Sequence, residues 1–275
     1  MEKISEKHQG RRQKEGIFRK PKKLINHIAQ LRKTSSLLSG GVVCKETKTK
    51  FRKGTKIVLA WSGGKDSYLL LHETTKRGFA VKYLFNLIDR EKEMSISPPF
   101  NQKLIILQAR ALGIPLKQIN VSTNPRLKFR NFLKSLKKQD INTIGMSYID
   151  ARGQRGFVVE SAKQAGISVF EPLCSRNRKK LIGRVIHQKI KAVIVGVNTQ
   201  QLKKDWLGKM ISKMFLHHLE KIGRVDYCGE RGEFQTCVLD APLFSKRLLV
   251  QQYYVLKAST YYYLYITKVR LVDKP

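Results

Sequence analysis

The chain has 275 residues, of which 41% are hydrophobic, so it is long enough to bury the core of one large domain or two small ones. Its 55 Lys and Arg against 20 Asp and Glu give a net charge of +35, which attracts polyanions such as ATP, RNA or acidic proteins. The composition excludes a membrane span, because no apolar run approaches the roughly 20 residues that cross a bilayer. The N-terminus has no apolar signal region, so we expect a cytoplasmic protein.

Residues 1–53 are predicted to form a basic, largely disordered N-terminal extension. Residues 1–54 hold sixteen Lys and Arg against four Asp and Glu, and the rest of the chain still carries an excess of positive charge. Within the extension, four apolar residues between positions 24 and 31 have the spacing of one face of a basic helix. The charge is compatible with contact to RNA or a ribosome, and equally with a general lysine bias that serves no specific partner. The role of the extension stays open.

From position 56 onward, short apolar runs typical of strands alternate with longer periodic segments typical of helices. This alternation predicts an α/β fold: a Rossmann-like, doubly wound parallel sheet with helices on both faces. The aromatic and β-branched tail predicts an antiparallel hairpin or a pair of edge strands, in a smaller α+β C-terminal domain. In chain order, the expected elements are strand 56–61, helix 67–76, strand 81–88, helix 101–112, strand 116–121, helix 127–138, strand 141–146, helix 152–165, strand 167–170, helix 180–190, strand 192–197, helix 206–221 and tail strands 248–257 and 260–272.

Residues 62–67, Ser-Gly-Gly-Lys-Asp-Ser, join the first expected strand to the first expected helix and suit an anion. Gly63 and Gly64 let the backbone approach a phosphate, and the helix offers its unpaired N-terminal amides and the positive end of its dipole. Lys65 adds a charge, and the two serines add hydroxyl donors. The spacing differs from a Walker A loop and from a dinucleotide-binding turn. The segment predicts a phosphate site, placed at the carboxyl end of a strand where such sheets bind ligands.

A second informative segment lies in the C-terminal half of the chain. Gly229 and Gly232 form a flexible loop that presents Glu230 and Glu233, and Thr236 follows on what is predicted to be a short strand. Two carboxylates on a glycine loop can bind an ammonium ion, ligate magnesium or act as a base. A solvated acidic turn explains the same pattern, so the residues alone leave both interpretations open.

Both segments match known families. The strand, the Ser-Gly-Gly-Lys-Asp-Ser loop and the helix together resemble the pyrophosphate loop of the ATP pyrophosphatase superfamily, whose members cut ATP between its α and β phosphates. Gly-Glu-Arg-Gly-Glu-Phe-Gln-Thr at 229–236, followed by Val-Leu-Asp-Ala-Pro-Leu-Phe at 238–244, resembles the diphthine–ammonia ligase family. Shorter segments at 108–115, 171–173 and 205–208 also match, and the resemblance extends from position 56 to the C-terminus.

The resemblance implies a fold, a division into domains and a reaction. The fold is adenine nucleotide alpha hydrolase-like, with an ATP-binding pyrophosphate-loop domain at 54–150 and a family-specific acceptor-binding domain at 151–275. The reaction is ATP-dependent amidation of diphthine, a modified histidine on translation elongation factor 2, which yields diphthamide, AMP and pyrophosphate. The implied cofactors are ATP and Mg²⁺, and the implied partners are ammonium and elongation factor 2 or another acceptor.

The resemblance also implies which residues form the site. The nucleotide-binding group is Ser62, Gly63, Gly64, Lys65, Asp66 and Ser67. The catalytic group is Lys65, Asp66, Glu230 and Glu233, in which Asp66 serves as a metal ligand and the glutamates recognise ammonium or deprotonate it. The substrate-binding group is Gly229, Glu230, Glu233 and Thr236.

The sequence departs from the family pattern in several places: an expected histidine is missing around 97–100, the acidic-and-arginine pattern near 152–155 is loosened, and three single residues differ. Arg231 stands where a small residue or Asn is usual, Gln235 where His or Glu is usual, and Cys174 where Trp is expected. These positions lie on the acceptor side, so ATP handling carries over further than the identity of the acceptor. One alternative is an ATP pyrophosphatase that acts on RNA or an unknown small carboxylate, which the charge favours and the absence of cysteine pairs opposes. The other is a non-catalytic relative that binds nucleotides or ribosomes.

Overall fold

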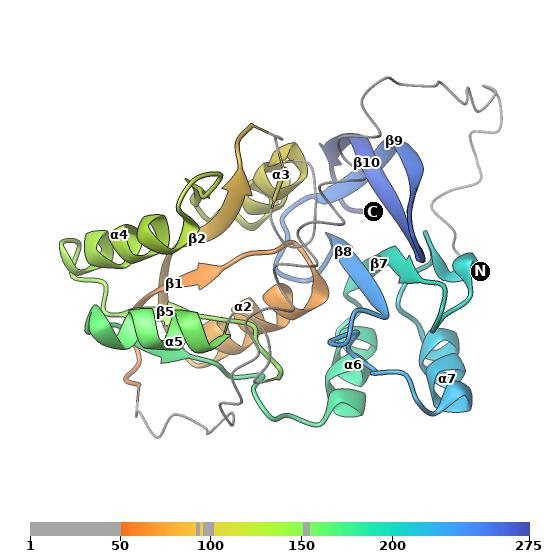
Figure 1. Cartoon of the computed structure of the whole chain (residues 1–275), viewed down its shortest axis with the longest axis horizontal. Helices are drawn as coiled ribbons and strands as arrows, with labels where there is room; N and C mark the ends of the chain where they lie inside the picture. The colour runs from red at the N-terminus through yellow and green to blue at the C-terminus, as the bar shows by residue number, and fades with distance from the viewer. Residues whose placement is uncertain (1–50, 92–93, 96–101, 151–154) are drawn as a thin grey trace.

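The computed structural model describes residues 51–91, 94–95, 102–150 and 155–275. The predicted extension at 1–53 therefore lies, except for its last three positions, outside the described residues. Among the helices of these ranges, none is long and apolar enough to cross a membrane. Two sheets with their helices make up the described chain, and they lie side by side in Figure 1.

The first sheet is built on five parallel strands in the order β4-β2-β1-β5-β6, with the short β3 added antiparallel to the end of β2. Non-consecutive neighbours require crossovers, and the helices between the strands supply them. In chain order, its elements are β1 (Lys56–Ala60), α2 (Lys65–Lys76), β2 (Ala80–Asp89), β3 (Met94–Ser95), α3 (Gln102–Leu112), β4 (Leu116–Asn120), α4 (Pro125–Lys137), β5 (Thr143–Gly145), α5 (Arg155–Gln164) and β6 (Ser168–Phe170).

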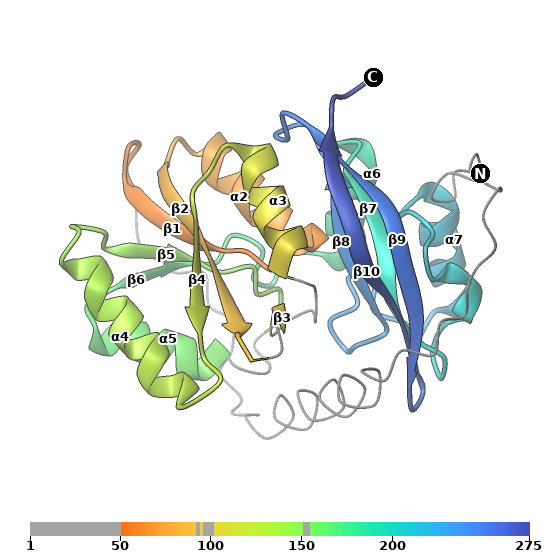
Figure 2. The ribbon, with the colours of Figure 1, turned by 90° about the horizontal axis from the view of Figure 1, so that it is seen from above.

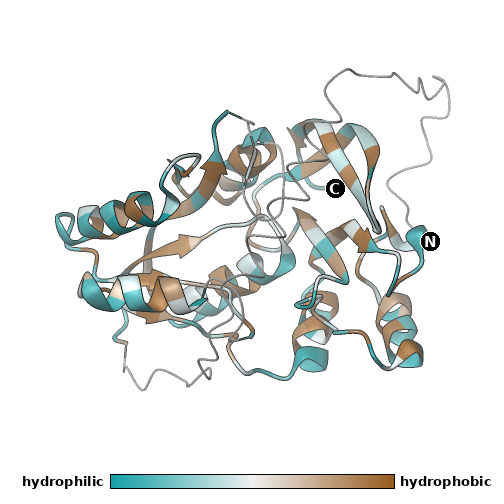
Figure 3. Cartoon of the chain, in the orientation of Figure 1, coloured by the Kyte–Doolittle hydropathy of each residue, from teal (hydrophilic) through white to brown (hydrophobic). Residues whose placement is uncertain are grey.

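Helices cover both faces of this sheet because its central strand is apolar on both sides. Leu59 of β1 packs on one face with Tyr68 of α2 and Ile105 of α3. Val58 packs on the opposite face with Phe132 of α4. Figure 2 shows α2 and α3 on one side of the sheet and α4 and α5 on the other, and Figure 3 shows hydrophobic residues concentrated in its strands. The prediction of a doubly wound parallel sheet is confirmed.

The second sheet is antiparallel, in the order β8-β7-β10-β9. Its longest strands, β9 and β10, pair along their lengths as a hairpin, which confirms the hairpin predicted for the tail. The smaller α+β unit is therefore also confirmed. Its elements are α6 (Arg178–His187), β7 (Lys191–Asn198), the 3₁₀ helix η1 (Lys204–Trp206), α7 (Lys213–Ile222), β8 (Phe234–Asp240), β9 (Arg247–Ala258) and β10 (Tyr261–Val272).

Two details differ from the expected elements. The helix expected at 206–221 begins only at Lys213, because Trp206 ends a 3₁₀ turn and the Ser212 hydroxyl caps the helix by accepting from the amide of Phe215. In addition, β6 lies beyond position 150 in the chain but pairs with β5 in the first sheet. The predicted division into domains at 54–150 and 151–275 stays a prediction, and the second sheet itself starts at β7.

The two sheets share one hydrophobic core. Leu59 of β1 and Tyr68 of α2 belong to the same buried cluster as Val193 of β7 and Phe234 of β8. The amide of Val238 in β8 also donates to the carbonyl of Gly63, in the loop that follows the first strand, at 2.9 Å. The second sheet is thereby held against that loop.

Candidate active site

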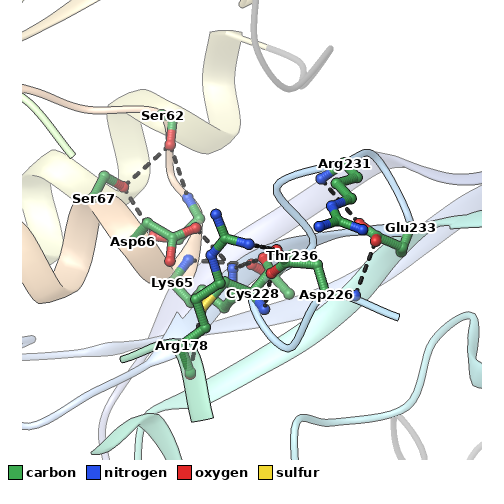
Figure 4. A network of polar contacts seen from close by, with 11 residues as sticks. Ser62, Lys65, Asp66, Ser67, Arg178, Asp226, Cys228, Arg231, Glu233 and Thr236 are labelled. Carbon is green, nitrogen blue, oxygen red and sulfur yellow. Dashed lines mark hydrogen bonds and ion pairs between the residues drawn. The ribbon is translucent and has the colours of Figure 1, made fainter. Parts of the chain in front are cut away.

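The loop after β1 faces the first residues of β8. Gly64 is the N-cap of α2 and offers no side-chain cap, so the first amides of the helix need acceptors outside the loop. The amide of Lys65 finds one in the hydroxyl of Thr236, at 3.2 Å. The hydroxyl of Ser62 lies 3.5 Å from the amide of Gly64 and 3.3 Å from the hydroxyl of Ser67 (Figure 4). The structure thus brings together the amides and hydroxyls predicted to bind phosphate.

Gly63 must be glycine for two independent reasons. Its φ of +80° lies in the left-handed region, which side chains with a Cβ rarely adopt. A Cβ at this position would lie 2.5 Å from Oε1 of Gln108 and 2.7 Å from Cδ1 of Ile105. The loop is therefore pressed closely against α3, and its glycine allows that approach.

Gln108 of α3 holds the loop at 62–67 through a hydrogen bond to Gly63, and it was not predicted as a site residue. It is fully buried in α3. Its Nε2 donates to the carbonyl of Gly63 at 3.0 Å and to the carbonyl of Val238 at 2.8 Å, while its Oε1 accepts from Nε1 of Trp61 at 3.0 Å. The side chain joins the end of β1, the loop and β8. The sequence placed Gln108 in a family-like segment, and its polar character on a buried helix face was the available signal.

Lys65 is buried at the junction between the two sheets, with only 3% of its surface exposed. Its Nζ donates to Oδ2 of Asp66 at 2.7 Å and to the carbonyl of Cys228 at 2.5 Å, and it lies 5.4 Å from the ring centre of Phe234. Burial lowers the pKa of this ammonium, but the neighbouring Asp66, Cys228 and Glu230 raise it more, so its pKa lies above the ordinary value. Lys65 therefore holds a fixed positive charge beside the loop.

Asp66 has one oxygen left over. Its Oδ2 pairs with Lys65, whereas Oδ1 is buried and has no hydrogen-bond partner among the described residues. A buried carboxylate oxygen without a partner is costly unless a cation or donor reaches it. No group of three His, Cys, Asp or Glu side chains in the described ranges suits a metal ion. The unpartnered Oδ1 of Asp66 fits Mg²⁺, because this ion often binds through one carboxylate together with phosphate oxygens and water.

Glu230 stands at the rim of the site, close enough to Lys65, Asp66 and Asp226 to interact with their charges. Much of the residue is exposed on the loop, while its carboxyl group has protein atoms around it. Burial and the negative charges of Asp66 and Asp226 raise the pKa of Glu230 to about 7, although Lys65 and Arg178 oppose that rise. A carboxyl group with this pKa can both hold and release a proton near neutral pH.

Glu233 occupies a different position from Glu230. It is completely buried, and its two oxygens accept from backbone amides, Oε1 from Asp226 at 2.9 Å and Oε2 from Arg231 at 3.0 Å (Figure 4). Gly229 belongs to the same turn, where a Cβ would lie 2.6 Å from the carbonyl of Phe234. Both side-chain hydrogen bonds of Glu233 thus go to backbone amides of its own segment, and they fix the conformation of the glycine loop.

Arg178 and Asp226 complete the polar network, and sequence reasoning assigned neither of them a role. Arg178, the first residue of α6, pairs through Nη1 with Asp226 and through Nη2 with Asp150 at 2.9 Å. The carboxylate of Asp226 is fully buried. The position of Asp226 at the start of the glycine-loop segment was a sequence signal for a role in the site. Arg178 had no such signal, because a single basic residue at a helix start is common in so basic a chain.

This arrangement combines the loop predicted to bind phosphate with the buried ammonium of Lys65, an unpartnered carboxylate oxygen of Asp66 and the titratable Glu230. It defines an α/β protein with a doubly wound parallel sheet, in which the loop predicted to bind phosphate contacts a second, antiparallel sheet. Comparison with known families gives the particular family. Residues 55–169 match the diphthamide synthase N-terminal domain and residues 177–272 match the diphthamide synthase C-terminal domain. The chain belongs to the diphthamide synthase family.

Individual relatives agree with that assignment. The chain is 29% identical over 214 residues to the diphthine–ammonia ligase of Mus musculus, a match that covers 69% of this chain and 80% of the relative. The enzyme of the same name from Homo sapiens is 28% identical over the same shares. The diphthine–ammonia ligase of Schizosaccharomyces pombe is 27% identical over 243 residues, which cover 80% of this chain and 40% of that longer protein. Similarity therefore extends over most of the chain.

Among solved structures, the U34-tRNA thiolase of Methanococcus maripaludis is similar with a TM-score of 0.29 and 12% identity, over 55% of this chain and 58% of that chain. So distant a likeness carries no weight for the function.

Proposed function

We propose that the protein is an ATP-dependent ligase that amidates the carboxylate of diphthine on translation elongation factor 2 with ammonia. The observation that carries this proposal is the contact of Lys65 with both halves of the chain, through Asp66 beside the phosphate loop and through the carbonyl of Cys228 in the glycine loop. ATP activation and the use of ammonia are thereby assigned to neighbouring groups. The relatives named as diphthine–ammonia ligases support the choice of acceptor.

The first step forms an acyl-adenylate. An oxygen of the acceptor carboxylate attacks the α-phosphorus of ATP, the bond between the α and β phosphates breaks, and pyrophosphate leaves. Negative charge then grows on the phosphate oxygens, and preorganised donors and cations stabilise it. Lys65 supplies a permanent positive charge, while Ser62, Ser67 and the glycine amides supply donors to the pyrophosphate.

Mg²⁺ is part of this proposal. The unpartnered Oδ1 of Asp66 is the group that would hold it, together with phosphate oxygens of ATP. When bound, the ion would neutralise phosphate charge during adenylation. The ammonium of Lys65 contacts the carboxylate of Asp66 directly, so the positive side chain and the carboxylate that would hold Mg²⁺ lie next to each other.

The second step uses ammonia. The carboxylate of Glu230 accepts a proton from ammonium, the free ammonia attacks the acyl carbon, AMP leaves, and the proton that the new amide nitrogen loses passes to the AMP phosphate or to water. The raised pKa of Glu230, at about 7, supports this role because such a carboxylate is a stronger base than an ordinary one. We propose that Glu233, predicted from the sequence as a second catalytic carboxylate, instead positions the loop through its two amide contacts. Thr236 acts by holding the amide of Lys65.

The net charge of +35 supports docking to a partner that carries nucleic acid or acidic surface, such as a ribosome-associated factor. Contact with RNA itself stays a prediction. The buried Lys65 and the unpartnered carboxylate oxygen of Asp66 support a functional ATP site over a non-catalytic relative.

The proposal is tested by AMP release in the presence of ATP, Mg²⁺, ammonium and elongation factor 2 that carries diphthine. We expect AMP only when the acceptor is present, and a rate reduced by roughly two to three orders of magnitude in the Lys65→Ala variant, as for the loss of a main charge-stabilising group. Unmodified elongation factor 2 and bulk tRNA are the alternative acceptors. AMP formed with tRNA but without diphthine would overturn the acceptor assignment, and ATP binding without any AMP would overturn the enzyme assignment.

A further inference from the structure

Arg178 lies where the chain passes from the first sheet into the second. It is the first residue of α6, directly after Asn177, whose side chain caps the helix by accepting from the amide of Lys180 at 2.9 Å. The cap fixes the start of the helix, and with it the direction of the Arg178 backbone. The side chain of Arg178 is 29% exposed, so the guanidinium stands at the edge of the site.

The guanidinium of Arg178 joins two carboxylates from different units. One belongs to Asp150, which follows β5 of the first sheet, at 2.9 Å from Nη2. The other belongs to Asp226, at the start of the glycine loop, and is entirely inaccessible to solvent. A buried carboxylate needs a counter-charge or it destabilises its surroundings. Among the contacts of the described residues, Arg178 is the positive partner of Asp226.

Asp226 in turn organises the beginning of the glycine loop. Its Oδ1 accepts from the amide of Cys228 at 2.8 Å, and its backbone carbonyl accepts from the amide of Gly229 at 3.1 Å. The thiol of Cys228 lies 3.5 Å from the carbonyl of Arg178. The turn from Asp226 to Gly229 is thus tied to α6 at two points.

The same turn provides a hydrogen-bond acceptor for Lys65. The carbonyl of Cys228 accepts from Nζ of Lys65, and Glu230 follows two residues later (Figure 4 shows the approach of Arg178, Cys228 and Lys65). A displacement of the turn would therefore move both the acceptor of Lys65 and the carboxylate assigned to ammonia.

We propose that Arg178 is a positioning residue of the amidation reaction, which holds the turn at 226–230 against the phosphate loop so that Glu230 and the carbonyl of Cys228 face Lys65. The inference rests on the proposed function for its catalytic consequence, but its structural part does not. Without the guanidinium, the buried Asp226 would lie near Glu230 and Asp66 with no counter-charge, and repulsion would open the turn. Arg178 thereby couples the ammonia side of the site to its ATP side.

The test compares Arg178→Gln with Arg178→Lys and with a matched control, Arg184→Gln. Arg184 lies on the same helix, is similarly exposed at 33%, and pairs with Glu73 away from the glycine loop. Hydrogen exchange of the full chain is measured first, because it requires no acceptor. In Arg178→Gln we expect the amides of 226–231 to exchange at least about tenfold faster, as local opening of this turn becomes easier, with no such change in Arg184→Gln.

Kinetics in the amidation assay supply the second readout. We expect Arg178→Gln to raise KM for ammonium by about tenfold or more while KM for ATP changes by less than about threefold. Arg178→Lys should recover part of the loss because it restores the charge but not the fork that reaches two carboxylates. In the double variant Arg178→Gln with Asp226→Asn, the slow exchange should return, since the neutral amide needs no counter-charge.

The outcomes separate the two proposals. If the unmutated protein forms no acceptor-dependent AMP, the proposed function fails while the exchange data still decide the role of Arg178. If Arg178→Gln matches Arg184→Gln in both exchange and KM for ammonium, the positioning role is overturned. Equal losses of ATP and ammonium affinity in Arg178→Gln would likewise overturn it, because they indicate a general structural defect.

Discussion

The backbone amide of Lys65, at the start of α2, donates to the hydroxyl of Thr236, in β8, at 3.2 Å across 171 positions of the chain. One partner begins a helix that packs on the first sheet and the other belongs to the second sheet, so a residue of the second sheet contacts the loop predicted to bind phosphate. An amide at the start of a helix is a natural phosphate donor. Here the N–H of Lys65 already donates to a side-chain oxygen, and this contact links the geometry of the loop to the position of β8.

Replacement of Thr236 by Val should weaken the ATP site. Val keeps the shape of Thr but removes the acceptor, so the buried amide of Lys65 loses its partner at a cost of about 1–3 kcal/mol. We expect a lower affinity for ATP, measured by calorimetric titration, and a slightly lower stability in urea. Thr236→Ser keeps the hydroxyl and should bind ATP nearly as the unmutated protein does. Equal affinities of the Val and Ser variants would show that the hydroxyl has no part in the loop.

Gly63→Ala should destabilise the loop at 62–67 through a steric clash in addition to backbone strain. Gly54→Ala is the matched control: Gly54 has a φ of +82°, and no atom of the described residues lies within 4 Å of where its Cβ would be, whereas at Gly63 a Cβ would meet Gln108 at 2.5 Å. The shared left-handed backbone costs about 1–2 kcal/mol in each variant. We expect Gly63→Ala to be the less stable of the two in urea unfolding and to lose ATP binding. Similar behaviour of both variants would refute a close fit between the loop and α3.

The rate should depend on pH through Glu230, whose pKa is raised from 4.5 to about 7. A base works only when deprotonated, so the contribution of Glu230 should grow as pH rises through that value. The supply of ammonia also grows with pH, but it does so equally for Glu230→Gln. The ratio of the unmutated rate to the Glu230→Gln rate should therefore rise about tenfold between about pH 6 and about pH 8. A ratio that stays constant over this range would remove Glu230 as the base.

The buried ion pair between Arg155 and Glu171 should contribute strongly to stability. Arg155 and Glu171 form two parallel hydrogen bonds, Nε to Oε1 at 2.8 Å and Nη2 to Oε2 at 2.7 Å, and both side chains are buried. Glu171→Gln leaves the guanidinium without its counter-charge and should cost about 3–5 kcal/mol in urea unfolding. Asp140→Asn, which breaks the exposed pair with Lys56, should change stability far less, because solvent screens an exposed ion pair. Comparable losses in both variants would contradict the assigned burial.

Much of the fold was predictable because strand and helix periods are written locally in the chain. The apolar run at 56–61 became the central strand β1, and the tail at 248–272 became a hairpin. The helix predicted at 206–221 was placed too far toward the N-terminus. Trp206 belongs to a 3₁₀ turn, from which it packs against Phe215 and His218 of the helix. That packing depends on tertiary contacts, which a local pattern does not contain.

The site was predictable only in part. The loop at 62–67 was recognised because glycines, a lysine and serines between a strand and a helix have few other uses. Glu233 was grouped with Glu230, although one is buried under backbone amides and the other stands at the rim, and spacing on a loop does not separate these positions. Gln108 and Arg178 act on residues far away in the chain, so their contacts emerge only from the fold.

In the proposed reaction, one site activates a carboxylate with ATP and then joins it to ammonia. The most direct measurement follows ammonium labelled with heavy nitrogen into elongation factor 2 that carries diphthine, by mass spectrometry of the modified peptide, alongside AMP. We predict heavy nitrogen bound covalently to the acceptor, one AMP for each nitrogen incorporated, and neither product with Lys65→Ala. AMP without incorporated nitrogen, or incorporation that the Lys65→Ala variant retains, would contradict this two-step reaction.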